Sequence, residues 1–184
     1  MQPPTPPTSP SGTPPASPST PSSPGSPSGV ASASPSTASG VVGCDTAIGA
    51  EASPPPGFAV VGGVVALPVR RTLQVSRVEL PVGGTGWFAK QGLLVRRDRL
   101  AELTVPEELR DRFWLTWGGM AHPAARVTAG PCGGAARWVA FAGGYVVRAP
   151  ACLAVRVRGR GGEQHEVRVP VGAPCPQRPS PVIR

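Results

Sequence analysis

The first forty residues most constrain what this chain can fold into, because they cannot supply a hydrophobic core. They contain 12 Pro, 12 Ser and 5 Thr and no charged side chain. Their apolar side chains are Met1, Val30 and four alanines, so burial could not offset the roughly 1–2 kcal/mol of backbone entropy lost per ordered residue. We therefore predict a disordered Pro/Ser/Thr-rich stalk or linker over residues 1–43.

The composition of this segment favours a semi-extended spacer. Proline promotes polyproline II segments, and the Ser, Thr and Gly residues between the prolines restore flexibility. Ser/Thr-rich stretches that contain proline are also typical of O-glycosylated stalks. The alternative is an unmodified disordered tail without a particular role.

Residues 44–176 are predicted to form one folded domain, followed by a flexible C-terminal tail at 177–184. The domain has an ordinary single-domain length. It consists of short β-type runs separated by Gly and Pro, with one helical turn expected at 106–111. This spacing predicts an all-β fold, a single antiparallel β-sandwich of the immunoglobulin type or a related one. The predicted strands are Phe58–Ala66, Thr72–Leu80, Gly92–Arg96, Leu100–Val105, Phe113–Trp117, Ala124–Thr128, Ala136–Ala142, Tyr145–Ala149, Cys152–Arg158 and Glu166–Val171.

The last two predicted strands form a β-hairpin when their apolar residues are placed on one face. A turn about Gly162 puts Val155 opposite Val169. The same register puts Arg156 opposite Arg168, and like charges directly opposite each other are unfavourable.

Four cysteines lie in the folded domain, and their even number beside a mucin-like stalk favours two disulfides. Their spacing includes no C-x-x-C motif and no pair of histidines lies near them in the sequence, so no structural zinc site is expected. A two-residue hairpin turn at Gly143-Gly144 would bring the segment around Cys132 toward Cys152, which leaves Cys44 to pair with Cys175. Free buried cysteines in a cytosolic protein are the alternative.

The end of the domain carries an ordered set of residues: Cys132, Trp138, Phe141-Ala142-Gly143-Gly144, Cys152, Gly172 and Cys175. This order resembles a family of small exported, β-rich proteins of actinomycetes, which are lipoprotein-like or anchored and carry a low-complexity spacer before the domain. The resemblance covers residues 132–175. It implies export and a β-rich domain, and it implies no catalytic residue.

An extracellular or cell-envelope location is expected from the disulfides and the stalk. No window approaches the ~18 apolar residues of a spanning helix, and the N-terminus lacks the charged and apolar regions of a secretory signal. Val41-Val42-Gly43-Cys44 resembles a lipobox, but the residues before it are polar. We therefore expect either that Met1 is not the true start or that a signal or membrane anchor lies upstream of the given sequence. A cytoplasmic location is the alternative.

No residue pattern predicts catalysis, a cofactor or a metal site. His122 and His165 are interpreted as two surface histidines, and the carboxylates at 107–111 as one solvated turn rather than a glycosidase pair. Gly62-Gly63 and Gly83-Gly84 are interpreted as turn or bulge residues, since no lysine or helix start follows them to hold a phosphate.

The charge of the chain points to anionic partners. Its formal net charge is +8 and its pI is near 10.9, which favours attraction to anionic cell-wall polymers or to a membrane surface. Nucleic acid ranks lower because the arginines are scattered and no recognition helix is visible. The exceptions are the clustered Arg96, Arg97 and Arg99, which we combine with Trp114, expected to point out of its strand toward solvent, as a candidate binding surface.

These observations predict a non-enzymatic binding or structural module, displayed on a flexible stalk outside the cell or in its envelope. One alternative is an accessory domain of an envelope hydrolase, which a pocket with convergent carboxylate or histidine groups would indicate. The other is an intracellular basic nucleic-acid-binding protein, which reduced cysteines and a contiguous arginine face would indicate.

Overall fold

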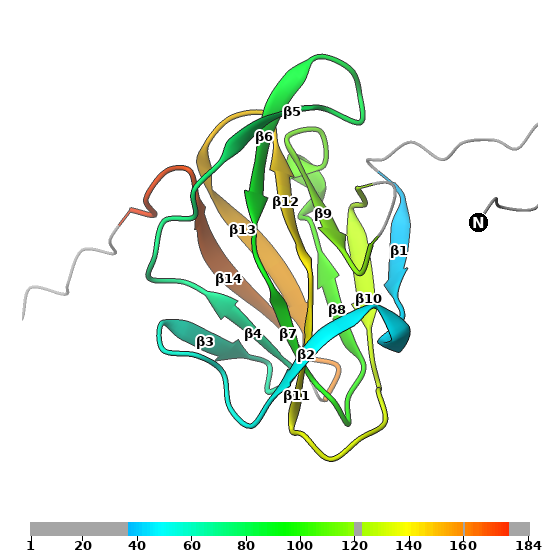
Figure 1. The fold of residues 1–184 in the computed structure, drawn as a ribbon. Helices are drawn as coiled ribbons and strands as arrows, with labels where there is room; N and C mark the ends of the chain where they lie inside the picture. The colour runs from blue at the N-terminus through cyan, green and yellow to red at the C-terminus, as the bar shows by residue number, and fades with distance from the viewer. Residues whose placement is uncertain (1–36, 120–122, 160, 177–184) are drawn as a thin grey trace, which may run out of the picture. The chain divides into compact units, whose positions relative to one another are not determined.

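The computed structural model describes residues 37–119, 123–159 and 161–176, and the structural statements below concern these residues (Figure 1). They form strands and two single-turn 3-10 helices, so the predicted all-β class is confirmed. The helical turns are η1 (Cys44–Thr46) and η2 (Glu107–Leu109), the second within the turn expected at 106–111. In this part of the chain, no helix has the length and apolar character needed to cross a membrane.

Each predicted strand overlaps an observed one, and three strands, β1, β2 and β6, were not predicted. The strands are β1 (Ser39–Val42), β2 (Ala47–Glu51), β3 (Phe58–Val61), β4 (Val65–Pro68), β5 (Ser76–Glu79), β6 (Thr85–Lys90), β7 (Leu93–Arg96), β8 (Ala101–Thr104), β9 (Phe113–Trp117), β10 (Arg126–Ala129), β11 (Trp138–Phe141), β12 (Gly143–Val147), β13 (Ala151–Arg158) and β14 (Gln164–Val171).

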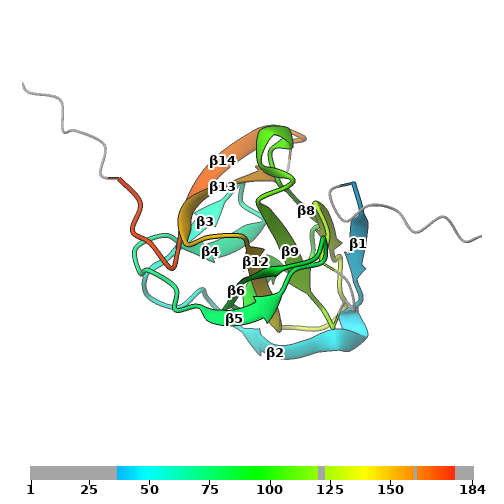
Figure 2. The same cartoon turned by 90° about the horizontal axis from the view of Figure 1, so that it is seen from above.

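The strands form three hydrogen-bonded sheets among the described residues. Sheet A has the order β1-β10-β8-β13-β14, sheet B the order β2-β11-β7-β4-β3, and sheet C the order β5-β6-β12-β9. Seen from above, the three sheets surround a common interior (Figure 2). A single sandwich of the immunoglobulin type is therefore not confirmed.

One apolar core holds the sheets together. Leu103 of sheet A, Val95 of sheet B and Leu115 of sheet C are fully buried and belong to the same cluster of packed side chains. In β8 the buried Ala101 and Leu103 alternate with partly exposed residues, the period-two pattern of a strand with one buried face. Burial of this shared interior is the main stabilising term of the fold.

The folded part begins before the predicted boundary at residue 44. β1 pairs in parallel with β10 from Ser39 opposite Arg126 to Val42 opposite Ala129. Val42 is 2% exposed and is part of the main core cluster. The domain boundary predicted between residues 43 and 44 is therefore wrong over 39–42, because a short apolar run at the end of a polar segment is enough to add an edge strand.

Gly62-Gly63 forms a tight turn, as predicted, although the strand predicted over Phe58–Ala66 proves to be a hairpin. Both glycines have positive φ, 56° and 67°, which matches the hairpin turn that suits twisted strands. The Val64 amide donates to the Val61 carbonyl oxygen over 3.2 Å and closes the turn between β3 and β4.

The β13–β14 hairpin exists, but its register differs by two residues from the prediction. Val155 lies opposite Val167, and Arg156 lies opposite Glu166. A shift of two keeps the valines on the buried face. It also replaces the like-charged pair of Arg156 and Arg168 by Arg156 and Glu166, whose charged groups lie 4.0 Å apart.

The hairpin predicted at Gly143-Gly144 is wrong. β11 ends at Phe141 and pairs with β2 and β7, whereas β12 starts at Gly143 and pairs with β6 and β9. The chain crosses here from one sheet to another. A Cβ atom on Gly143 would overlap the Thr116 carbonyl oxygen, and one on Gly144 would overlap that of Ala89. The two glycines therefore allow a close approach of neighbouring strands instead of a turn.

Candidate functional site

The four cysteines form two disulfides, but the predicted pairing is wrong. Cys44 is bonded to Cys132 and Cys152 to Cys175, with Cα–Cα distances of 5.7 Å and 4.8 Å. Both distances lie within the range that a disulfide allows. The predicted pairs depended on the hairpin at residues 143–144, and without it Cys132 is carried away from Cys152.

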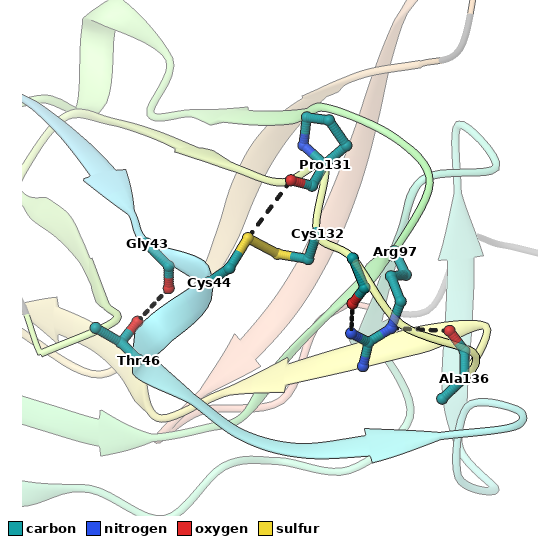
Figure 3. The surroundings of a disulfide bond; sticks show 8 residues. Gly43, Cys44, Thr46, Arg97, Pro131, Cys132 and Ala136 are labelled. Atoms are coloured by element: carbon teal, nitrogen blue, oxygen red, sulfur yellow. Dashed lines mark hydrogen bonds between the residues drawn. A yellow bond between two sulfur atoms is a disulfide. The ribbon is translucent and has the colours of Figure 1, made fainter.

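The Cys44–Cys132 bond joins the start of the domain to the loop between β10 and β11 (Figure 3). Cys44 Sγ lies 3.4 Å from the Pro131 carbonyl oxygen. This is a van der Waals contact and not a hydrogen bond, because a disulfide sulfur carries no hydrogen. Beside it, the Thr46 hydroxyl donates to the Gly43 carbonyl oxygen over 2.7 Å. The end of β1 is thereby tied to the rest of the domain by a covalent bond.

Arg97, one of the predicted surface arginines, braces this same loop. Its Nε donates to the Ala136 carbonyl oxygen over 2.9 Å, and its Nη1 donates to that of Gly133 (Figure 3). The Cys132 amide donates in turn to the Arg97 carbonyl oxygen over 2.7 Å. The Arg97 guanidinium therefore stabilises the chain around Cys132 through hydrogen bonds, and its role is structural.

Arg96 and Arg99 also have partners within the domain, since both form ion pairs with Asp98. Both lie against Asp98, at 3.2 Å and 3.3 Å, and the Arg96 guanidinium sits 5.8 Å from the centre of the Trp138 ring. Desolvation raises the pKa of the Asp98 carboxyl, but the hydrogen bond from Arg96 and the charges of both arginines outweigh it and leave the pKa below its ordinary value. The three arginines do not form a free cationic patch.

Trp114 is not on the surface. It points away from the main core, as predicted, but its exposure is 0% because a second cluster covers it, formed with Leu80 and Val146. This second cluster was not predicted, because β6, which contributes Phe88 to it, was not predicted as a strand. Trp114 therefore cannot belong to a binding surface, and the structure replaces that expectation with a packing role.

Most of the other aromatic side chains are buried, including Phe113, Trp117, Phe141 and Tyr145. Trp117 and Tyr145 pack edge to face with ring centres 5.2 Å apart, and Trp117 Nε1 donates to the Gln91 carbonyl oxygen over 2.8 Å. The Tyr145 hydroxyl is buried without a hydrogen-bond partner among the described residues. Burial raises the pKa of this hydroxyl far above its ordinary value.

The residues weighed for catalysis are not brought together. His165 lies 3.2 Å from Glu163 at the exposed end of the β13–β14 hairpin, and His122 lies outside the described residues. The pKa of Glu163 is lowered first by its own backbone amide and then by His165. Glu107 and Glu108 make surface ion pairs with arginines. In the described ranges, no three His, Cys, Asp or Glu side chains are placed to hold a metal ion.

A mixed pocket of about 380 Å³ is the feature that sequence reasoning missed. Among its lining residues, Pro68 and Leu73 are buried and Phe58 is half-buried, and we call these three the floor. The polar residues Arg71, Gln74 and Lys90, which are exposed, and Gln91 are called the rim. No described lining residue is acidic. The sequence signal was weak, because Arg71 follows β4 whereas Lys90, the only lysine of the chain, ends β6, and no local pattern predicts that both line one pocket.

The two rim cations, Arg71 and Lys90, and two cations near them in the sequence, Arg70 and Arg77, make no ion pair in the described structure. Arg77 packs against the Trp87 ring at 4.6 Å. Arg70, Arg71 and Lys90 therefore carry charge that is not paired with a carboxylate in the described structure, in contrast to Arg96 and Arg99, and the one acidic residue of the segment 70–90 is Glu79.

No family model matches the chain, and no curated protein or solved structure is significantly similar to it.

Proposed function

We propose that this protein is a non-catalytic binding module, displayed outside the cell or in the cell envelope on its Pro/Ser/Thr-rich stalk, and that it binds anionic envelope polymers. The observation that carries this proposal is the cationic segment at 70–90, whose Arg70, Arg71, Arg77 and Lys90 make no ion pair within the described residues.

The disulfides support the oxidising compartment. Structural disulfides persist outside the cytosol and are rare within it. In the chain-entropy view, a loop as long as the 88-residue separation of Cys44 and Cys132 contributes about 4–5 kcal/mol to stability. The shorter loop closed by Cys152 and Cys175 contributes about 3 kcal/mol. Since typical domains are stable by about 5–15 kcal/mol, loss of both bonds would remove much of the margin.

A polymer suits the distribution of these cations better than a small free anion. Exposed charges are screened over about 8 Å at physiological ionic strength, so each contact is weak by itself. A polyanion engages several contacts at once, and its effective concentration at the second contact raises the overall affinity. The stalk supplies the reach that a module needs to meet such a polymer.

Two finer expectations belong to this proposal. The antiparallel sandwich is supported by the antiparallel pairing throughout sheets B and C and by the core that side chains of both sheets share. Membership in the exported actinomycete family is supported by the order of cysteines, Trp138 and paired glycines between residues 132 and 175.

Equilibrium binding of the full chain tests the proposal. Oligogalacturonate and poly(glycerol phosphate) serve as anionic polymers, dextran as the neutral one, and phosphatidylglycerol vesicles and duplex DNA as competing polyanionic partners. We expect binding to an anionic polymer that weakens as salt is added, with no binding to dextran. Absence of binding to either anionic polymer at low salt, or tighter binding to vesicles or DNA, would contradict it.

A further inference from the structure

We propose that the pocket bounded by Phe58, Arg71, Gln74 and Lys90 is a binding site for an acidic sugar unit, a pyranose that carries a carboxylate. This inference rests on the proposed function and gives it a location. It replaces the surface first expected at Trp114 and Arg96–Arg99, where the aromatic ring is buried and the arginines are bound to other groups.

The size and floor of the pocket suit a sugar ring. A volume of about 380 Å³ lies in the range of natural small-ligand sites, which are about 300–1,000 Å³. Pro68 and Leu73 are buried and Phe58 is half-buried. These apolar groups give the C–H face of a pyranose a surface to pack against, whereas a bare inorganic anion would leave that floor unused.

The rim supplies the polar groups that such a ring needs. Arg71 and Lys90 carry the positive charge that attracts a carboxylate, and charge-assisted hydrogen bonds are the stronger kind. The amide of Gln74 both donates and accepts, which matches a sugar hydroxyl. Within the described part of the chain, no hydrogen bond or ion pair occupies the side chains of Arg71, Gln74 or Lys90.

The walls of the pocket are held in place by main-chain bonds. The Leu73 amide donates to the Pro170 carbonyl oxygen over 2.8 Å, and the Gly172 amide donates to the Leu73 carbonyl oxygen over 2.9 Å. These bonds fix the segment with Arg71 and Gln74 against the end of β14. Lys90 ends β6, which pairs with β12 up to Gly144. The site is therefore formed before ligand arrives, which lowers the entropy cost of binding.

The test is a titration of the full chain with oligogalacturonate, compared with a neutral galactose oligomer and with poly(glycerol phosphate). The double variant Arg71→Gln with Lys90→Gln removes the rim cations. Its matched control is Arg112→Gln with Arg137→Gln, which removes the same charge from two exposed arginines that do not line this pocket. Gln74→Ala is the third variant, since it changes hydrogen bonding without changing charge. Thermal unfolding of each variant verifies that the domain is folded.

We expect the rim double variant to bind oligogalacturonate about a hundredfold more weakly, about tenfold for each cation. The control should change affinity by less than about threefold, as expected for screened, distant charges. Gln74→Ala should weaken binding by about threefold to tenfold, and the neutral oligomer should not bind.

Equal losses in the rim variant and the control would overturn the pocket while leaving diffuse polyanion binding, and with it the proposed function, intact. Unchanged affinity in Gln74→Ala, or preference for poly(glycerol phosphate), would overturn the sugar assignment. No binding of the unaltered chain to either anionic polymer would overturn the proposed function itself.

Discussion

The Arg97 guanidinium is bonded to the main-chain oxygen of Ala136, with 2.9 Å between Nε and that oxygen. This contact, together with the bond to Gly133, holds the loop that carries Cys132. A residue that looked like part of a cationic surface in the sequence is thus a brace for a disulfide loop, and the difference has measurable consequences.

Replacing Arg97 by Ala should lower the free energy of unfolding by about 2 kcal/mol, because two carbonyl oxygens lose a charged donor. Arg99→Ala is the matched control, since Arg99 makes a surface ion pair with Asp98, and should cost less than about 1 kcal/mol. Chemical denaturation of the oxidised proteins measures both. Equal effects would show that Arg97 does not brace the loop.

Removal of the N-terminal segment should be harmless up to residue 36 and costly beyond it. A chain that starts at Thr37 keeps β1, whereas one that starts at Cys44 loses β1 and the buried Val42. Burial of one valine side chain is worth about 1.5–3 kcal/mol, so the shorter chain should melt several degrees lower. Thermal unfolding of both chains decides this, and equal melting temperatures would show that β1 adds no stability.

Local sequence alone predicted the class of the fold and most strands, because alternating apolar residues and glycine punctuation are local signals. It did not predict which strands meet. The segments Val61-Gly-Gly-Val64 and Ala142-Gly-Gly-Tyr145 look alike in sequence, yet the first is a turn and the second crosses between sheets. The difference lies in the neighbours of Gly143 and Gly144, the backbones of β6 and β9, which are distant in sequence.

The same limit explains the candidate site. The cysteine pairing depended on the mistaken hairpin, and the pocket depends on β6, which was not predicted. Arg97 could not be separated from Arg96 and Arg99 by composition, because its partners are main-chain oxygens from a segment about forty residues later. Contacts between segments that are distant in the sequence were not predicted, because no local pattern of residues specifies them.

Gly144→Ala should prevent normal folding or lower the free energy of unfolding by more than about 3 kcal/mol, because the new methyl group would overlap the Ala89 carbonyl oxygen. Gly49→Ala is the control, since a methyl group there meets no atom within 4 Å. Circular dichroism and denaturation of both variants measure the difference. A stable Gly144→Ala protein would contradict the close approach of β12 to the Ala89 carbonyl oxygen of β6.

Tyr145→Phe should raise the free energy of unfolding by about 1 kcal/mol. The hydroxyl is buried without a partner among the described residues, and an unsatisfied buried polar group costs about 1–3 kcal/mol. The phenylalanine ring keeps the edge-to-face contact with Trp117. Denaturation of the two proteins measures the change, and a loss of stability would show that the hydroxyl has a partner such as a buried water.

Non-reducing peptide mapping of the protein isolated from its native source tests both the oxidising compartment and the strand arrangement. A domain closed by disulfides in an oxidising compartment should yield linked peptides containing Cys44 with Cys132 and Cys152 with Cys175, and no free thiol. Four free thiols would contradict the extracellular location. A Cys132–Cys152 linkage would contradict the strand arrangement from which the site was built.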